Sequence, residues 1–411
     1  MSMLKEKNIL LLVCANFFAS VAMGITSIGV AWIIVDRAGG EKLLGSATIF
    51  ITLIIFLSAP YVGVIVDKFS RKNIYLANQL IGAVIVLPIG IYGLMSDHYQ
   101  TWQLLMLYFS SFIYYAVHYP NLLAFVQEIF PENHLNKLNG LLEIESQSSS
   151  VVAGGAAGIL FGVFDYAFLF LVVGFAFFIS LLLVWLIPYQ WKARENTGKK
   201  NVAAEIKEGF SFIEKNKRLA LLIFSLLIPF LMVMVGNYLR PVYINSMLSD
   251  NPSVYGYSSM VYAIGAVFAG IIIPLMHGKW GAYGAVILSL SLFAGSLFFI
   301  SVLPYISLFL LLQIFQGFGN SGARISRKNI MVEHVPNHLI GRVNSFFELF
   351  GTGVRLLLLV LFTATLEYIP PAAALFITSI IALTALLLAF RYKSFLSKNP
   401  FLLKGNEQAA K

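Results

Sequence analysis

Residues 63–72 read Gly-Val-Ile-Val-Asp-Lys-Phe-Ser-Arg-Lys, and they lie between two hydrophobic runs that are each long enough to cross a bilayer. An acid followed by closely spaced basic residues at a membrane boundary indicates a tight turn on the cytoplasmic side. The acid is Asp67, and the basic residues are Lys68, Arg71 and Lys72. The pattern therefore predicts a fold of membrane-spanning segments joined by short turns.

The composition excludes a water-soluble chain. Hydrophobic residues make up 59% of the 411 residues and charged residues 11%, against roughly a quarter charged in ordinary globular proteins. The mean hydropathy is +0.82. The formal net charge of +9 is interpreted as a signature of topology and of contact with anionic lipid, and no nucleic-acid partner is expected.

A scan of the hydropathy predicts about twelve membrane spans. Their length and the lack of strict alternation favour helices over a barrel, because only these two structures satisfy the backbone in lipid. The expected fold class is an all-α membrane protein. The spans are expected near residues 8–35, 43–66, 73–95, 102–127, 139–162, 166–188, 219–244, 254–276, 281–302, 305–330, 342–366 and 371–391.

The distribution of Lys and Arg predicts that both termini are cytoplasmic. In this orientation Arg37, Lys42 and Arg240 fall in outer loops, and most other basic residues lie on the inner side, as the positive-inside rule requires. The first span is too long for a cleaved signal peptide and is expected to remain as a helix. The single cysteine, Cys14, excludes an intramolecular disulfide.

A basic segment divides the chain into two halves of six spans. The predicted parts are a bundle over 1–189, a linker over 190–218, a second bundle over 219–393 and a cytoplasmic tail over 394–411. Within the linker, residues 203–212 can form an amphipathic surface helix. Two six-span halves joined by a basic loop are typical of transporters.

The stretch over residues 63–72 resembles the loop between helices 2 and 3 of the major facilitator superfamily, G-x-x-x-D-[RK]-x-G-R-[RK], with Ser70 in place of the usual Gly. Residues 118–121, 130–140, 207–210 and 335–343 resemble the macrolide-efflux and enterobactin-exporter branch of that family. The resemblance implies two pseudo-symmetric bundles and export by drug:proton antiport.

Two features depart from the antiporter pattern. The fourth span has no Arg, and residues 153–158 read Ala-Gly-Gly-Ala-Ala-Gly without the Pro of the fifth-helix signature. Proton antiport is therefore implied by the branch alone. No phosphate-binding loop and no metal-ligand cluster is recognisable, so no cofactor and no enzymatic activity are expected, and an ion gradient would have to drive transport.

The family resemblance implies that the 63–72 turn is a cytoplasmic gate in which the loop acid faces the start of helix 11 and the Arg helps to latch the two halves. The gate residues are expected to be Gly63, Asp67, Lys68, Arg71 and Lys72. A solvated basic turn that serves topology alone remains an alternative.

Ionisable residues within membrane spans are candidates for function because they are costly there. Arg324 and Arg327 share one flank of a helix, and Glu348 and Arg355 share a face of the next. We expect the three arginines to bind substrate, and Glu348 to carry protons. The alternatives are that Arg327 reaches the interface and that Arg355 pairs with Glu348.

In the first half, Glu143 and Glu145 are further candidate proton carriers, because a desolvated carboxylate can exchange protons at physiological pH. Glu143 shares a helix face with Gln147, whereas Glu145 points elsewhere. An exposed acid at a helix start is an equally good interpretation.

His118, Asn16 and Asn237 complete the predicted substrate site. His118 is also interpretable as a hydrogen-bonded packing residue, and the two asparagines as polar contacts between helices.

The sequence thus predicts a bacterial cytoplasmic-membrane (inner-membrane) exporter that works as a monomer, with protons, lipid and a small molecule as its partners. The excess of Arg in the second half favours an anionic, siderophore-like metabolite over a cationic drug. The alternatives are a multidrug or macrolide efflux pump, an importer or facilitator of a small metabolite, and a membrane receptor or scaffold.

Overall fold

The computed structural model describes residues 7–96, 98–130, 132–190, 210–249, 251–336 and 339–391; within these ranges, residues 132–137, 139–140 and 278–280 are described as backbone only. Most of the expected linker, including residues 203–209 of its amphipathic helix, and the expected C-terminal tail lie outside the described residues, whereas residues 210–212 are helical. The division at 189, 218 and 393 stays a prediction.

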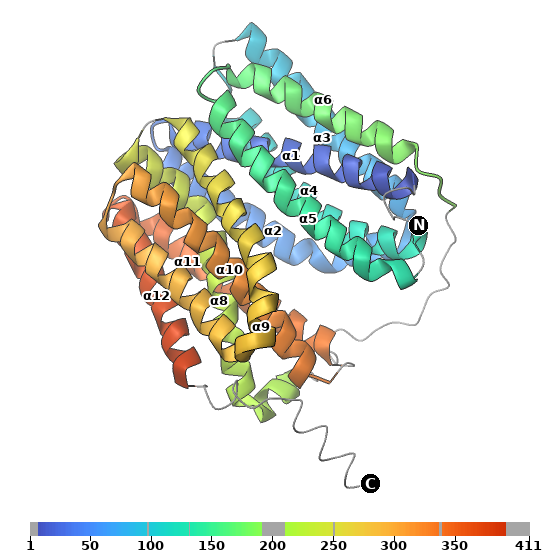
Figure 1. The fold of residues 1–411 in the computed structure, drawn as a ribbon. Coiled ribbons are helices and arrows are strands. Elements are labelled where there is room, and N and C mark those ends of the chain that lie inside the picture. Colours follow the sequence, from blue (N-terminus) through green and yellow to red (C-terminus); the bar gives the residue numbers. More distant parts are fainter. Residues whose placement is uncertain are drawn as a thin grey trace. The chain divides into compact units, whose positions relative to one another are not determined.

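The described chain is almost entirely helical (Figure 1), which confirms the predicted fold class. Backbone groups in hydrocarbon need partners within the same segment, and a helix supplies them. The elements are α1 (Lys7–Val35), α2 (Gly40–Lys68), α3 (Arg71–Met95), α4 (Thr101–Ile129), α5 (Glu132–Leu160), α6 (Tyr166–Trp185), α8 (Lys217–Tyr243), η2 (Ile244–Leu248), α9 (Pro252–Val302), α10 (Ile306–His334), α11 (Ile340–Thr365) and α12 (Pro371–Arg391).

Helix α9 covers two of the expected spans. Its course changes at Gly281, where φ is 74° and the conformation is not helical. Such a left-handed φ strains a residue with a side chain, and glycine adopts it freely. Gly281 therefore marks the boundary between the spans expected at 254–276 and 281–302.

Nine segments of the described chain are long and apolar enough to cross a membrane. Helices α4, α5 and α10 also have 29 residues each, which exceeds the bilayer requirement. They carry more polar side chains, including His118, Glu145 and Gln313. The count of twelve spans stays a prediction. Arg240 was expected in an outer loop and instead lies in α8, within one of the nine segments.

The fold divides into two compact units. The first contains the described residues of Met1–Thr197 and Arg240–Ala263, and the second those of Gly198–Leu239 and Ile264–Lys411. In the first unit α3 packs along α6, and α1 contacts α4, α5 and α6. Helix α1 is consequently the central element of the first unit, and its polar side chains lie among other helices.

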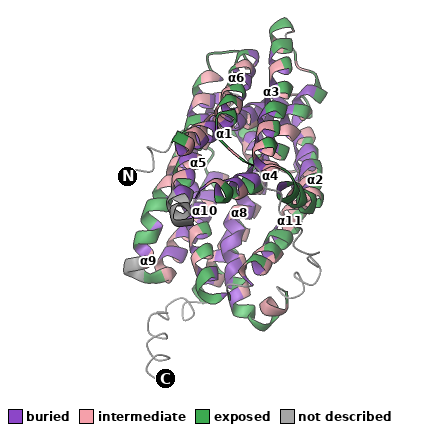
Figure 2. Ribbon diagram, turned by 90° about the vertical axis from the view of Figure 1, so that its right-hand side faces the viewer, coloured by how far each residue is buried: buried purple, intermediate pink, exposed green. Residues whose placement is uncertain are grey.

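Large apolar side chains are exposed along the helices, as expected for a protein whose solvent is lipid. On α2, Phe50, Leu57 and Tyr61 are 54%, 60% and 72% exposed. Figure 2 shows that exposed and buried residues alternate along most helices. Polar side chains that are nevertheless buried are therefore the informative exceptions.

The turn between α2 and α3 begins the second of these helices with a side-chain cap. The hydroxyl of Ser70 accepts a hydrogen bond from the backbone N–H of Asn73 at 3.3 Å. Serine is among the preferred residues at this position because its oxygen satisfies a free N–H of the first turn. Ser70 thus has a structural role where the family pattern has glycine.

Candidate functional site

A buried carboxylate lies where α1, α3, α4 and α5 meet. Glu145 on α5 is 4% exposed, and its Oε2 accepts a short hydrogen bond from the side-chain amide of Asn16 on α1. Its Oε1 accepts a hydrogen bond from Ser149 Oγ at 2.6 Å. Asn16 Oδ1 in turn lies 2.7 Å from His118 Nε2 on α4 and 3.4 Å from the hydroxyl of Tyr75 on α3. We call these five residues the Glu145 cluster.

Aromatic rings enclose the histidine of this cluster. The ring of Tyr114 stacks on His118 with centroids 5.0 Å apart, and the ring of Tyr75 approaches it edge-on at 5.2 Å. Tyr114 is itself held by Gln79 Nε2, which donates to its hydroxyl at 3.1 Å, and by Asn78 Nδ2, which donates to its carbonyl oxygen at 3.3 Å. The imidazole consequently has a fixed position against α1.

The two acids of α5 that were expected to carry protons lie in different environments. Glu143 is exposed, and its Oε1 accepts a hydrogen bond from Gln147 Nε2 at 3.0 Å. This contact agrees with the expected shared face of Glu143 and Gln147, and Glu145 points inward on another face. Of the two, Glu145 is therefore the carboxylate that the helices of the first unit enclose.

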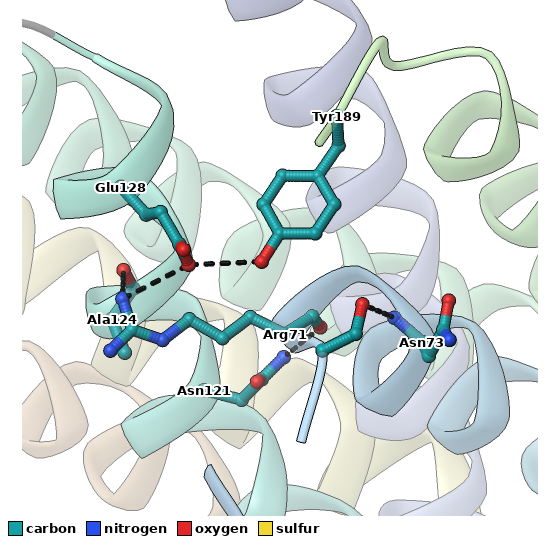
Figure 3. A network of polar contacts seen from close by, with 7 residues as sticks. Arg71, Asn73, Asn121, Ala124, Glu128 and Tyr189 are labelled. Carbon is teal, nitrogen blue, oxygen red and sulfur yellow. Dashed lines mark hydrogen bonds and ion pairs between the residues drawn. The ribbon is translucent and has the colours of Figure 1, made fainter. Parts of the chain in front are cut away.

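The turn between α2 and α3 forms a second polar network (Figure 3). Arg71 is buried, and its Nη1 donates to Ala124 O at 2.5 Å and lies 3.2 Å from Glu128 Oε2. Asn121 Nδ2 donates to Arg71 O at 3.0 Å. The guanidinium thus joins the start of α3 to the end of α4, which is more than a solvated turn would provide.

Three hydrogen bonds extend this network to the end of α6. The hydroxyl of Tyr189 donates to Glu128 Oε2 at 3.0 Å, and burial, followed by this hydrogen bond, raises the pKa of Tyr189. Lys72 Nζ donates to the carbonyl oxygens of Trp185 and Ile187 at 2.8 and 2.7 Å. A cation is well placed there because the last carbonyl groups of a helix lack partners within the helix.

The other predicted gate residues are exposed. Asp67 and Lys68 lie at the end of α2, and among the described residues a Cβ placed on Gly63 would meet nothing within 4 Å. Their role at a gate stays a prediction.

In the second unit, Arg327 on α10 and Glu348 on α11 form an ion pair with Nη2 and Oε1 3.4 Å apart. Arg324 is exposed, and Arg355 is half-buried. Asn237 on α8 is exposed. Glu348, the acid expected near the α10 arginines, thus pairs with Arg327. The substrate-binding roles of these residues stay predictions.

Sequence reasoning missed several residues of these networks. Tyr75, Glu128 and Tyr189 were not predicted, although Glu128, as an acid at the end of an expected span, is a recognisable signal. Arg240 was also missed as an intramembrane residue: its guanidinium carbon lies 5.4 Å from the centre of the Tyr262 ring. Counting Arg240 inside its span would have identified it as costly there.

The residues that the structure describes contain no group of three or more His, Cys, Asp or Glu side chains that could hold a metal ion.

The comparisons with known proteins give one family match, several similar sequences and several solved structures of similar fold. The sequence model described as Major Facilitator Superfamily matches residues 12–303. Macrolide efflux protein A of Streptococcus pyogenes is 23% identical over 257 residues, which are 62% of this chain and 63% of that protein. The putative bacilysin exporter BacE of Bacillus subtilis is 27% identical over 321 residues, 74% of this chain and 75% of that protein.

The matched region does not span the full length of these relatives. For the MFS-type transporter YfiS of Bacillus subtilis, 24% identical over 224 residues, it covers 53% of this chain and 52% of that protein. Among solved structures, the nucleoside transporter NupG (D323A mutant) superimposes with a TM-score of 0.70 at 15% identity, over 94% of this chain and 99% of that chain. At this identity the likeness shows the fold alone.

Proposed function

The chain belongs to the Major Facilitator Superfamily, and on that basis we propose that it exports a small organic molecule from the cytoplasm in exchange for protons. The direction is supported by the names of two relatives, a macrolide efflux protein and a putative bacilysin exporter. Transport would proceed by alternating access in a bacterial cytoplasmic membrane, with both termini inside and a monomer as the working unit.

The observation that carries the proton-coupling proposal is the burial of Glu145 among α1, α4 and α5. A carboxylate in the membrane interior is costly when charged, and it persists where its protonation is used. Hydrogen bonds from Asn16 and Ser149 stabilise the charged form of Glu145, and burial destabilises it. Glu145 can therefore exist in both protonation states, as a proton carrier must.

The arginines of α10 and α11 support an anionic substrate. Arg324 is exposed, and Arg327 is only partly compensated, since its ion pair with Glu348 is at 3.4 Å and its Nη1 has no hydrogen-bond partner among the described residues. An Arg fork binds carboxylates in a bidentate manner and does not deprotonate. We therefore favour an anionic metabolite with carboxylate or catecholate groups, such as a siderophore.

A macrolide-type drug is the second candidate substrate, and the relative named for macrolide efflux favours it. A nucleoside transporter has the same fold, so import or facilitated diffusion of a metabolite would be compatible with the architecture.

The test uses everted membrane vesicles containing the full chain, with a macrolide and a catecholate siderophore as separate probes. We expect accumulation of the catecholate when a proton gradient is imposed, and its loss when the gradient is collapsed. Accumulation that is unaffected by collapse of the gradient would contradict proton coupling. Accumulation of the macrolide alone would contradict the proposal of an anionic substrate and favour the macrolide.

The variant Glu145→Gln should abolish gradient-driven accumulation and keep probe binding. Glu143→Gln is the matched comparison, because Glu143 lies two residues away on the same helix and is exposed. If only Glu143→Gln removes coupling, the proton carrier has been assigned to the wrong acid.

A further inference from the structure

The two carboxylate oxygens of Glu145 have partners of different chemistry. Oε2 faces the side-chain amide of Asn16, and Oε1 faces the hydroxyl of Ser149 at 2.6 Å. An amide NH2 group only donates, whereas a hydroxyl donates and accepts. The two oxygens therefore differ in their ability to carry a proton.

The contacts on the other side of Asn16 fix the orientation of its amide. Its Oδ1 lies 2.7 Å from His118 Nε2 and 3.4 Å from the hydroxyl of Tyr75, which donates to it. With Nδ2 committed to Glu145, Oδ1 can only accept from the histidine, so His118 Nε2 carries a hydrogen. Turning the amide over would bring Oδ1 against Oε2 of the charged carboxylate, where neither oxygen has a hydrogen to donate, so the charged form of Glu145 requires this orientation.

Ser149 has a second acceptor within reach. Its Oγ lies 2.9 Å from the backbone carbonyl oxygen of Glu145, besides 2.6 Å from Oε1. The hydroxyl has one hydrogen, which can point to only one of the two. When it points to the carbonyl oxygen, a lone pair of Oγ faces Oε1 and can accept a hydrogen bond from it.

We propose that Asn16 is a positioning residue that holds Oε2 of Glu145 with an N–H, so that Oε1 takes up the transported proton and donates it in a hydrogen bond to Ser149. This inference rests on the proposed function, because it deepens the role of Glu145 as proton carrier. It assigns Asn16 to proton coupling, whereas the sequence predicted that it binds substrate.

The step balances with one proton. A proton from solution forms an O–H bond at Oε1, and the charge of the carboxylate is neutralised. The Ser149 hydroxyl rotates from Oε1 to the carbonyl oxygen of Glu145, and the one covalent bond that breaks is the O–H bond of the hydronium ion that delivers the proton. Asn16 keeps its N–H on Oε2 in both states, which prevents protonation there because the amide nitrogen offers no acceptor.

The titratable groups around Glu145 come from the helices packed on α5. Helix α4 contributes His118, Tyr114 and Tyr115, and α3 contributes Tyr75. A test must therefore separate the proton on Glu145 from changes in these groups. A protonated carboxylic acid has its own infrared carbonyl-stretch band, which neither imidazole nor phenol shares.

The experiment is an infrared titration of the purified full chain in lipid. The band that disappears in Glu145→Gln reports the protonation of Glu145. The variant Asn16→Ala removes a hydrogen-bond donor that stabilises the charged form of Glu145. It should therefore move the titration midpoint of this band upward by about one pH unit. Ser149→Ala should move it by less than half as much, because the hydroxyl serves both protonation states.

Asn78→Ala is the matched control, because Asn78 is also a buried amide but donates to the Tyr114 backbone and not to the Glu145 cluster. It should leave the midpoint unchanged. The nearly isosteric Asn16→Asp also removes the donor and covers the case in which Asn16→Ala does not fold; its midpoint should rise further, because two acids share the site.

Equal midpoints in the wild type and the Asn16 variants would overturn the proposal, as would a larger shift in Ser149→Ala than in Asn16→Ala. The absence of any band lost in Glu145→Gln would also overturn it. Failure of the proposed function looks different: gradient-driven transport would persist in Glu145→Gln, while the infrared shifts of the Asn16 variants would still be observed.

Discussion

Arg327 Nη2 lies 3.4 Å from Glu348 Oε1, so an arginine predicted to bind substrate has an acidic partner on the neighbouring helix. Glu348 is about half exposed in this pair, with a side-chain exposure of 48%. Arg327 is 14% exposed, and the separation of 3.4 Å is longer than the roughly 2.7–2.9 Å of a strong charge-assisted hydrogen bond. The pair is therefore better suited to exchanging Glu348 for a substrate anion than to holding α10 and α11 together.

The first prediction follows from this exchange. Arg327→Ala should raise the KM for an anionic substrate by about tenfold or more, the effect of losing a hydrogen bond to a charged group, with little change in melting temperature. Glu348→Gln should lower that KM, because the competing acid is removed. Transport assays at varied substrate concentration would measure both, with Arg391→Ala at the end of α12 as control. A large loss of melting temperature in Arg327→Ala would show that the arginine is structural.

The second prediction concerns the buried Arg71. Arg71→Ala removes the ion pair with Glu128 and the hydrogen bond to Ala124 O. The Glu128 carboxylate then keeps the hydrogen bond from Tyr189. We expect a loss of about 1–3 kcal/mol in the free energy of unfolding. Arg71→Lys should recover part of it, since an ammonium keeps the charge but not the planar fork. Thermal unfolding in detergent would test this, and Lys68→Ala, at an exposed residue of the same turn, should be neutral.

The third prediction is a pH dependence outside the membrane spans. Burial, with a smaller contribution from Asp165, raises the pKa of Tyr99 from 10.0 to about 12. Because the unfolded chain ionises first, the stability linked to this phenol is complete below pH 10 and is lost as the pH rises towards about 12. The wild type should therefore lose more stability than Tyr99→Phe in this alkaline range, as measured by chemical unfolding.

At neutral pH the same substitution should be neutral or slightly stabilising, because the buried Tyr99 hydroxyl has no hydrogen-bond partner among the described residues. Tyr368→Phe is the control, since Tyr368 is 82% exposed. If both variants show the same alkaline dependence as the wild type, Tyr99 is not the group responsible.

The helical class and the helix positions were predictable because lipid leaves few choices. A long apolar run must satisfy its own backbone groups, so its length and composition determine its structure. The predicted span at 73–95, for example, became α3 at Arg71–Met95. Family membership was predictable from residues 63–72, because a short turn between two spans has a definite length, so its pattern of residues can be compared position by position with the family pattern.

The contacts of the site were less predictable, because they join residues far apart in sequence. Asn16 and Glu145 are 129 positions apart, and helix periodicity gives only the relative directions of Glu143 and Glu145 on their own helix. Which face meets α1 depends on packing in three dimensions. The same limit applied to Arg71, whose partner Glu128 lies on another helix.

The last prediction concerns a close approach between α5 and α9 in the first unit. A Cβ on Gly256 would lie 2.5 Å from Gly158 Cα and 2.8 Å from Ala157 C. Both are backbone atoms, so no rotamer change can relieve the clash and the two helices must separate. Gly256→Ala should therefore destabilise the protein by about 1–3 kcal/mol, measured as a lower melting temperature. Gly270→Ala on the same helix is the control: its Cβ would meet nothing within 4 Å among the described residues, so the variant should keep or slightly raise the melting temperature. An equal effect of the two substitutions would mean that the general cost of altering a helix glycine, and not the contact with Gly158, determines the outcome.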